Sequence, residues 1–146
     1  MLTLHHYGMV VADLEAGSRT YLGAGARPVG DTYADPIQKA HIRFLQMPGN
    51  PSLIELIAPY AEDAPVAGFL DRYGGGIHHA CYMTDQLDHV VTQLRNAGAL
   101  PVFGPEPAVA FGGRTVAFLY GRDRSLLELV EAAPHATPAA ILAGRE

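Results

Sequence analysis

Hydrophobic and polar residues alternate along much of this chain, which predicts short β-strands joined by turns, together with two helices. In the first half, the strands are expected at 2–11, 28–31, 41–46 and 52–58, and the helix at 14–22. Asp13 has the side chain of a helix N-cap, and Gly23 can end the helix. Residues 32–39 contain an Asp-Pro step and are expected to form a loop.

The second half repeats this order of elements. Its strands are expected at 77–83, 101–103, 115–120 and 125–131, and its helix at 85–96. Apolar residues from Leu87 to Leu94 recur on one face of that helix. The Pro/Gly-rich segment 104–113 is expected to form a loop, and the Ala/Pro-rich end of the chain to be frayed or a short helix.

The two halves also match residue by residue at an offset of 73 positions, half of the 146-residue length. The segment 24–29 matches 97–102 except at one position, and 52–57 closely matches 125–130. Matches in the same order indicate a tandem duplication, in which each half is a βαβββ module and the whole is an α+β fold. The predicted organisation is a first module, a connector, a second module and a tail, at 1–60, 61–76, 77–131 and 132–146.

Composition narrows the classes of protein that this chain can represent. The content of 49% hydrophobic and 17% charged residues is typical of a globular domain. No apolar run approaches the roughly 20 residues that a membrane-spanning helix needs. No secretory signal is visible, and a single cysteine, Cys81, is typical of the reducing cytoplasm. A net charge of −5 and only one lysine argue against nucleic acid as the partner.

Each half carries a glutamate in the middle of an otherwise apolar strand, and burying a carboxylate there is costly unless it is paired, protonated or bound to a cation. Glu55 and Glu128 follow the strand histidines His6 and His79, respectively, by 49 positions. A single such residue is usually structural, but the duplicated spacing favours a metal site. Two imidazoles and two carboxylates suit a divalent ion such as Co, Ni, Mn, Fe or Zn.

The glycine-rich segment 74–79 and the last hairpin of the chain carry a resemblance to a known family. Together with 62–66 and 68–70, the first is similar to the central part of the methylmalonyl-CoA epimerases, and 114–119 with 127–131 is similar to their last hairpin. The duplicated pattern over residues 2–131 resembles the wider vicinal oxygen chelate superfamily, which also includes glyoxalase I, extradiol dioxygenases and antibiotic-resistance proteins. The resemblance implies a curved mixed sheet around a metal-binding cleft, with one divalent ion held by His6, Glu55, His79 and Glu128.

This resemblance and the ligand chemistry imply a metal-dependent isomerase, an epimerase that removes a proton next to a carbonyl group. Glu55 and Glu128 are the candidate catalytic residues, because epimerisation needs a proton donor or acceptor on each face of a planar enolate. The expected substrate is an acyl-CoA thioester or another carbonyl compound, and the family implies a homodimer. The alternatives are a glyoxalase I-type lactoylglutathione lyase, a dioxygenase, and a non-catalytic protein that binds a small molecule or an antibiotic.

Further residues have expected positions near this site. His5 and His78 precede the candidate ligands and, because side chains alternate along a strand, are expected on the opposite face, either exposed or beside the ligands. Cys81 is expected to be a small core residue, not a nucleophile. Arg114 follows a glycine-rich segment that could form a flap, where it would reach an anionic substrate or lie in solvent.

Overall fold

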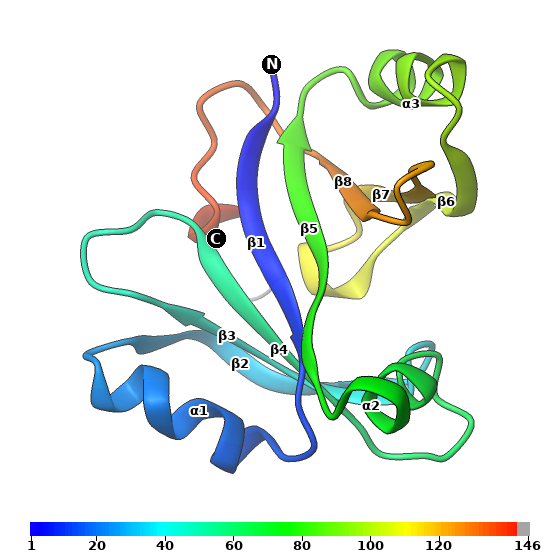
Figure 1. Ribbon diagram of the computed structural model, residues 1–146. Coiled ribbons are helices and arrows are strands. Elements are labelled where there is room, and N and C mark those ends of the chain that lie inside the picture. Colours follow the sequence, from blue (N-terminus) through cyan, green and yellow to red (C-terminus); the bar gives the residue numbers. More distant parts are fainter. Residues whose placement is uncertain (143–146) are drawn as a thin grey trace. The chain divides into compact units, whose positions relative to one another are not determined.

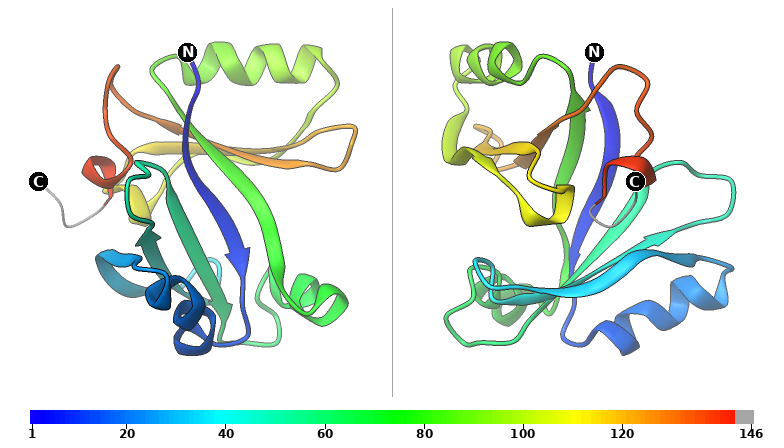
Figure 2. Two further views of the ribbon diagram at one scale, coloured as in Figure 1. Left: turned by 60° about the vertical axis from the view of Figure 1, so that its left-hand side comes forward. Right: turned by 180° about the vertical axis from the view of Figure 1, so that it is seen from behind.

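The computed structural model describes residues 1–142, which form eight strands, three α-helices and two short 3-10 helices (Figure 1). The strands are β1 (Thr3–Val10), β2 (Arg27–Asp35), β3 (Ala40–Gln46), β4 (Leu53–Pro59), β5 (Gly76–Thr84), β6 (Leu100–Pro107), β7 (Thr115–Tyr120) and β8 (Leu126–Glu131). The helices are α1 (Leu14–Gly23), α2 (Ala67–Tyr73), α3 (Leu87–Asn96), and the 3-10 turns η1 (Val109–Phe111) and η2 (Ala139–Ile141). Figure 2 shows the same elements from two further sides.

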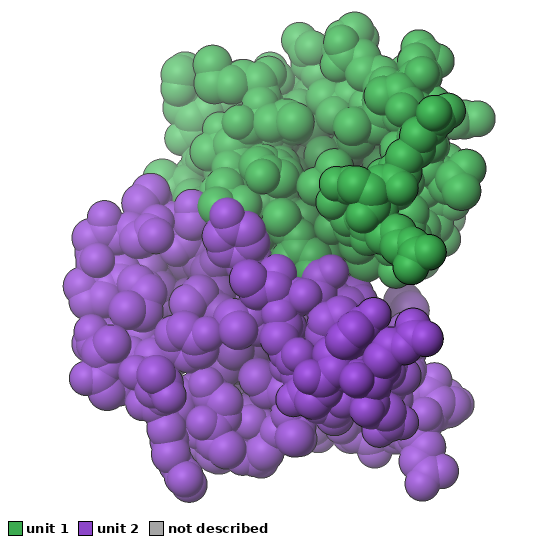
Figure 3. Space-filling model, viewed as in Figure 1, with its two compact units in different colours: residues 1–6, 79–146 green, residues 7–78 purple. Residues whose placement is uncertain are grey.

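The chain divides into two compact units, of which unit 1 comprises residues 1–6 and 79 onward and unit 2 comprises residues 7–78 (Figure 3). β1 and β5 cross this boundary, so each strand contributes residues to both units. These units differ from the predicted modules, whose boundaries were taken from the matches between the two halves of the sequence. The division into modules therefore stays a prediction. Within residues 1–142, none of the helices has the length and apolar character needed to cross a lipid bilayer.

In unit 2 the strand order is β2-β3-β4-β1, and β2, β3 and β4 pair antiparallel. Helix α1 packs on β3 and β4. Asp13 is its N-cap, as expected, because its Oδ2 accepts a 2.8 Å hydrogen bond from the backbone N–H of Ala16. Leu14, Leu45 and Leu56 are buried in the core cluster of this unit, and the removal of their apolar surface from water stabilises the unit.

In unit 1 the strand order is β1-β5-β8-β7-β6. β5 pairs parallel with β8, whereas β8, β7 and β6 pair antiparallel. Helix α3 packs on β8 and buries Leu87 and Val90 in a cluster with Leu119 and Leu129. The predicted α+β class is therefore confirmed, since both parallel and antiparallel pairs occur among the eight strands and each unit has an α-helix packed on its antiparallel strands.

Two strands are longer than the sequence predicts. β2 continues to Asp35 and β6 continues to Pro107, although the sequence predicts loops in both places. The neighbouring strands β3 and β7 pair with these segments after the register of pairing shifts. The shift lies between Val29 and Tyr33 in β2 and between Pro101 and Glu106 in β6. An irregularity of the same kind in both halves agrees with their origin by duplication.

The tail after β8 is ordered as far as it is described. η2 forms a single turn, and Ile141 and Leu142 are buried. Of the two alternatives expected for the tail, frayed or a short helix, the structure shows a short helix in residues 139–141. Residues 143–146 of the predicted tail lie outside the described residues.

A glycine turn between α2 and β5 sets the start of the strand that carries His79. Gly74 ends α2 with φ at 72°, and Gly75 follows with φ at 111°. A Cβ atom on Gly75 would lie 2.7 Å from the carbonyl oxygen of Val10, so only glycine fits this close approach. β5 begins at the next residue, Gly76.

Candidate metal-binding site

Two histidines from neighbouring strands of unit 1 meet at the centre of the candidate site. The Nε2 atoms of His6 on β1 and His79 on β5 are 3.1 Å apart, and both residues are buried. Their rings meet edge to face, with centroids 5.2 Å apart. Two ring nitrogens this close must share a proton or a cation, because two lone pairs would repel each other.

Glu128 on β8 completes a group of three. Its Oε2 lies 3.2 Å from Nε2 of His79 and 3.4 Å from Nε2 of His6. Burial alone would raise the pKa of Glu128, but hydrogen bonds from His6 and His79 outweigh burial and hold the pKa below its ordinary value. Glu128 is therefore an anion at neutral pH, in a position where two imidazoles face it.

The spacing of these three ligand atoms fits a divalent metal ion. Two atoms that are each about 2.1 Å from one ion lie about 3.0 Å apart in an octahedron and about 3.4 Å apart in a tetrahedron. The observed separations of 3.1, 3.2 and 3.4 Å fall within this range. His6, His79 and Glu128 could thus hold an ion with their backbones in place, although this donor set does not select one metal.

Glu55 belongs to unit 2, whereas the other three candidate ligands belong to unit 1. It lies in the middle of β4, 5% exposed, and pairs with Phe44 on β3. Glu128 is also 5% exposed and pairs with Phe118 on β7, so the two glutamates occupy corresponding places in their strand pairs. This register supports the duplication, and the role of Glu55 as a fourth ligand stays a prediction.

Of the two positions expected for His5, exposed or beside the candidate ligands, the structure shows the second. It is fully buried, its Nδ1 lies 2.7 Å from Nδ1 of His6, and its Nε2 lies 2.9 Å from the carbonyl oxygen of Pro138 in the tail. Burial and, to a smaller extent, nearby His6 together lower the pKa of His5 to about 3, against the opposing effects of Pro138 and Glu128. The sequence gives no local sign of this role, because Pro138 is 133 positions away.

His78, the repeat counterpart of His5, is only partly buried, and its ring meets the ring of Phe69 edge to face at 5.1 Å.

Arg114 was expected to reach a substrate or lie in solvent. Its Nη1 instead donates to the carbonyl oxygens of Phe111 at 3.0 Å and Ile141 at 3.1 Å, and so links η1 to the tail. The residue is nevertheless exposed, which agrees with the solvent alternative, and contact with a substrate stays a prediction.

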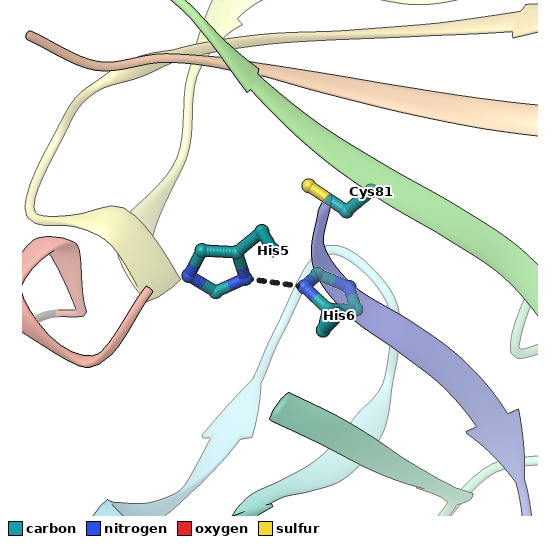
Figure 4. A group of neighbouring side chains, drawn as sticks. All are labelled: His5, His6 and Cys81. Atoms are coloured by element: carbon teal, nitrogen blue, oxygen red, sulfur yellow. Dashed lines mark hydrogen bonds between the residues drawn. The ribbon is translucent and has the colours of Figure 1, made fainter. Parts of the chain in front are cut away.

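Cys81 is buried, as expected of a small core residue. His5, His6 and Cys81 lie close together, with one ligand atom of each within 4.8 Å of the others (Figure 4). Figure 4 shows the hydrogen bond between the two rings, whose planes are nearly perpendicular at 83°, and Cys81 on strand β5. The 2.7 Å distance between the two Nδ1 atoms is that of a hydrogen bond and is shorter than the roughly 3.0–3.4 Å between two ligands of one ion.

Comparison with known proteins agrees with this geometry. The family model of the glyoxalase/bleomycin resistance protein/dioxygenase superfamily matches residues 5–118, which is most of the chain. The chain belongs to this superfamily. The match includes His6, Glu55 and His79, and it ends ten residues before Glu128.

The relatives within this superfamily include several epimerases. An ethylmalonyl-CoA/methylmalonyl-CoA epimerase of Cereibacter sphaeroides is 34% identical over 82% of this chain and 89% of its own length. The crystal structure of methylmalonyl-CoA epimerase from Mycobacterium tuberculosis aligns with a TM-score of 0.76 and 30% identity, over 90% of this chain and 88% of that chain. A variant of the Streptomyces coelicolor enzyme in complex with 2-nitronate-propionyl-CoA aligns with a TM-score of 0.77 and 28% identity, over 91% of this chain and 99% of that chain.

Proposed function

We propose that the protein is a divalent-metal-dependent epimerase that acts on the carbon next to the carbonyl group of an acyl-CoA thioester. The observation that carries this proposal is the convergence of Nε2 of His6, Nε2 of His79 and Oε2 of Glu128 within 3.4 Å of one another. Similarity to methylmalonyl-CoA epimerases over most of the chain supports the substrate class.

His6, His79 and Glu128 would hold the ion, with Glu55 as the fourth ligand suggested by the repeat. When bound, a divalent ion stabilises the negative charge that develops on carbonyl oxygens after a neighbouring proton leaves. In the reaction, the bond between the α-carbon and its hydrogen breaks, the electron pair moves into an enolate, and a proton returns to the opposite face. The products therefore differ from the substrate only in configuration.

The two glutamates are proposed to take part in this proton transfer, but their properties differ. The lowered pKa of Glu128 makes its Oε2 a good ligand for a cation and a weak base. Glu55, at the corresponding place of the first half, is the second candidate to exchange a proton with the substrate.

A direct test is hydrogen exchange at the α-carbon. The protein is freed of metal with a chelator, reloaded in turn with Co(II), Ni(II), Mn(II), Zn(II) or Fe(II), and mixed with methylmalonyl-CoA or ethylmalonyl-CoA in deuterated water. We expect NMR to show deuterium at the α-carbon with at least one metal and none with the metal-free protein. A lack of exchange with every metal and both thioesters would contradict the proposal.

A glyoxalase I-type lyase and an iron dioxygenase are the rival enzymes, because the superfamily model names both classes. The dioxygenase has a further argument, since two histidines and one carboxylate form the donor set of many non-haem iron oxygenases. The hemithioacetal of methylglyoxal and glutathione tests the first, and oxygen uptake with Fe(II) and a catechol tests the second. A protein that only binds small molecules would bind the thioester without exchange.

The proposal also covers the cellular location and the oligomeric state of the protein. A cytoplasmic location is consistent with a single, buried cysteine, and a homodimer is suggested by the family resemblance. Fractionation of cells and light scattering of the purified protein measure these two properties separately from the activity.

A further inference from the structure

Three kinds of side chain follow one another along the β7–β8 hairpin of unit 1. The candidate ligand Glu128 comes first, exposed apolar side chains come next, and the turn that joins the strands carries Arg122 and Arg124. We propose that this strip binds the coenzyme A part of the thioester, with its pantetheine arm on the apolar side chains and its phosphate groups beside the arginines. The inference rests on the proposed function and adds a subsite to it.

The strand pairing places the candidate ligand and the apolar side chains on one face. Paired residues of antiparallel strands point to the same side of a sheet, and so do residues two apart on one strand. Glu128 pairs with Phe118, and Leu126 pairs with Tyr120. Tyr120 also pairs with Leu100 on β6. The row of Leu126, Tyr120 and Leu100 therefore lies next to the row that contains Glu128, on the side of the turn.

These apolar side chains continue the candidate site outwards and are open to solvent. The ring of Phe118 meets the ring of His79 edge to face, with centroids 5.5 Å apart. Tyr120 is 42% exposed and Leu100 is 69% exposed. Leu119, which points to the opposite face, is buried in the cluster with α3. Helix α3 thus covers the other face of these strands and leaves the face with Glu128 accessible to a ligand.

Three of the four arginines described in unit 1 lie where the β7–β8 turn meets the end of α3. Arg122 and Arg124 are in the turn, and Arg95 is in the last turn of α3. The guanidinium group of Arg122 packs against Gly98, because a Cβ atom added to Gly98 would overlap with it. Within residues 1–142, none of the three guanidinium groups forms an ion pair or a hydrogen bond.

This group of arginines fits an anion with several charges. The carboxylate in the turn, Asp123, accepts hydrogen bonds from the backbone N–H of Ser125 at 3.0 Å and from its hydroxyl group at 2.6 Å. It therefore holds the turn in shape and leaves the guanidinium groups available. The net charge of the whole chain is −5, so a positive group at this place is an exception. Arginine binds phosphate through charge-assisted hydrogen bonds, and coenzyme A carries three phosphate groups.

The length of coenzyme A matches the length of the strip. Arg124 is four positions before Glu128, so at about 3.3 Å per residue their backbones lie at most about 13 Å apart. The pantetheine arm joins the thioester sulfur to the first phosphate through about a dozen bonds, which extend over roughly 15 Å at about 1.2 Å per bond. A thioester held beside Glu128 would therefore bring its phosphate groups within reach of the arginine side chains.

The test measures binding of coenzyme A to the full-length, metal-free protein. The fluorescence anisotropy of 1,N6-ethenocoenzyme A reports its binding, and displacement by coenzyme A, pantetheine or adenosine 3′,5′-bisphosphate gives the affinity for the whole ligand and for each of its ends. Circular dichroism shows that each variant is folded. In the wild type, we expect all three compounds to displace the probe, and coenzyme A to bind most tightly.

The charged end is tested by the double substitution Arg122→Gln and Arg124→Gln. We expect this variant to bind coenzyme A and adenosine 3′,5′-bisphosphate about 5- to 30-fold more weakly, and pantetheine as the wild type does, because only the first two carry phosphate. The control is Arg19→Gln with Arg72→Gln, which removes the same charge from exposed positions of unit 2. It should stay within about twofold of the wild type, since salt screens distant charges.

The apolar part is tested by Leu100→Ser with Tyr120→Ser. We expect coenzyme A and pantetheine to bind about 3- to 10-fold more weakly, and adenosine 3′,5′-bisphosphate to bind as in the wild type, because less apolar surface is removed from water. Tyr73→Ser with Ile77→Ser is the control, since these residues of unit 2 are 61% and 64% exposed. It should leave all three affinities unchanged.

Other results would overturn the inference. These are no displacement of the probe by coenzyme A in the wild type, unchanged affinities in either test variant, or losses in a control variant as large as in its test variant. An arginine variant that loses pantetheine as strongly as coenzyme A would also overturn it. Binding is measured without metal or turnover, so the expected affinities in a protein that exchanges no α-hydrogen would contradict the proposed function alone. Exchange by a protein with unchanged affinities in both test variants would contradict this inference alone.

Discussion

At the scale of single residues, the site is governed by which side chains are charged and which nitrogen carries a proton. Glu128 is anionic because hydrogen bonds from His6 and His79 lower its pKa more than burial raises it. His5 is neutral because burial lowers its pKa to about 3. An anion, two imidazoles and a neutral histidine beside them form a site that attracts a cation.

Glu128→Gln removes the carboxylate among the three grouped ligands of unit 1. We expect the variant to bind Co(II) or Mn(II) at least about tenfold more weakly, because an amide oxygen lacks the attraction of a carboxylate for a divalent ion. Titration calorimetry measures this affinity. Glu131→Gln, at the exposed end of the same strand, is the control and should bind metal as the wild type does. Equal affinities for both variants would exclude Glu128 as a ligand.

The pKa of His5 predicts a dependence of stability on pH. The unfolded chain binds a proton on this ring near pH 6.5, whereas the folded protein binds it only near pH 3, so stability falls as the pH decreases from 6.5 towards 3. Between pH 7 and pH 5, the wild type should lose about 2 kcal/mol more than His5→Asn.

Urea unfolding of the metal-free protein at the two pH values measures this difference. His89→Asn, on the exposed side of α3, should lose as much stability as the wild type. If His5→Asn is just as sensitive to acid as the wild type, the folded protein binds a proton on His5 near its ordinary pKa.

At the scale of elements, the site depends on how strands begin and how they pair. His79 lies three residues after the start of β5, directly beyond the glycine turn, and Glu128 and Glu55 lie at matching places in the two strand pairs β7–β8 and β3–β4. Each unit thus presents a buried carboxylate by the same local arrangement. The turn before β5 is the element on which a single substitution should act most strongly.

Gly75→Ala should destabilise the protein by about 3 kcal/mol or more, because its Cβ would lie 2.7 Å from the Val10 carbonyl oxygen and its φ of 111° is unfavourable for alanine. Gly76→Ala is the matched control, since φ is 118° there but no atom lies within 4 Å of the added Cβ. It should cost only about 1–2 kcal/mol. Chemical denaturation gives both values, and equal losses would show that the close approach to Val10 does not matter.

At the scale of the whole molecule, metal binding should stabilise the fold, because ligands from strands far apart in the sequence are brought together only in the folded chain. Metal at 100 times its dissociation constant adds about 2.7 kcal/mol of stability. For a chain of this length, we expect the midpoint of thermal unfolding to rise by about 5–10 °C.

Thermal unfolding with Co(II) and with a chelator measures this shift. Glu128→Gln should show a much smaller increase at the same Co(II) concentration. An identical unfolding temperature with and without metal in the wild type would contradict a metal site in the folded protein.

Much of this protein is determined by local sequence patterns. The duplication, the order of the strands and of helices α1 and α3, and the α+β class follow from the alternation of apolar residues and from the offset of 73, because these patterns are properties of neighbouring residues and of the repeat. Helix α2 in the connector was not predicted. The pairing of His6 with His79 follows from the same repeat, and Glu128 is recognisable as a carboxylate in an apolar strand. The family is confirmed by the superfamily match.

Tertiary structure decided the features that depend on distant partners. β2 and β6 extend through segments that look like loops, because β3 and β7 supply hydrogen bonds to them. The tail contacts both His5 and Arg114. Its Pro138 carbonyl oxygen accepts a hydrogen bond from buried His5, and its Ile141 carbonyl oxygen accepts one from Arg114. The burial and the hydrogen-bond partners of a side chain depend on the segment that covers it. For His5 that segment is 133 positions away, so the residues next to His5 in the sequence do not reveal it.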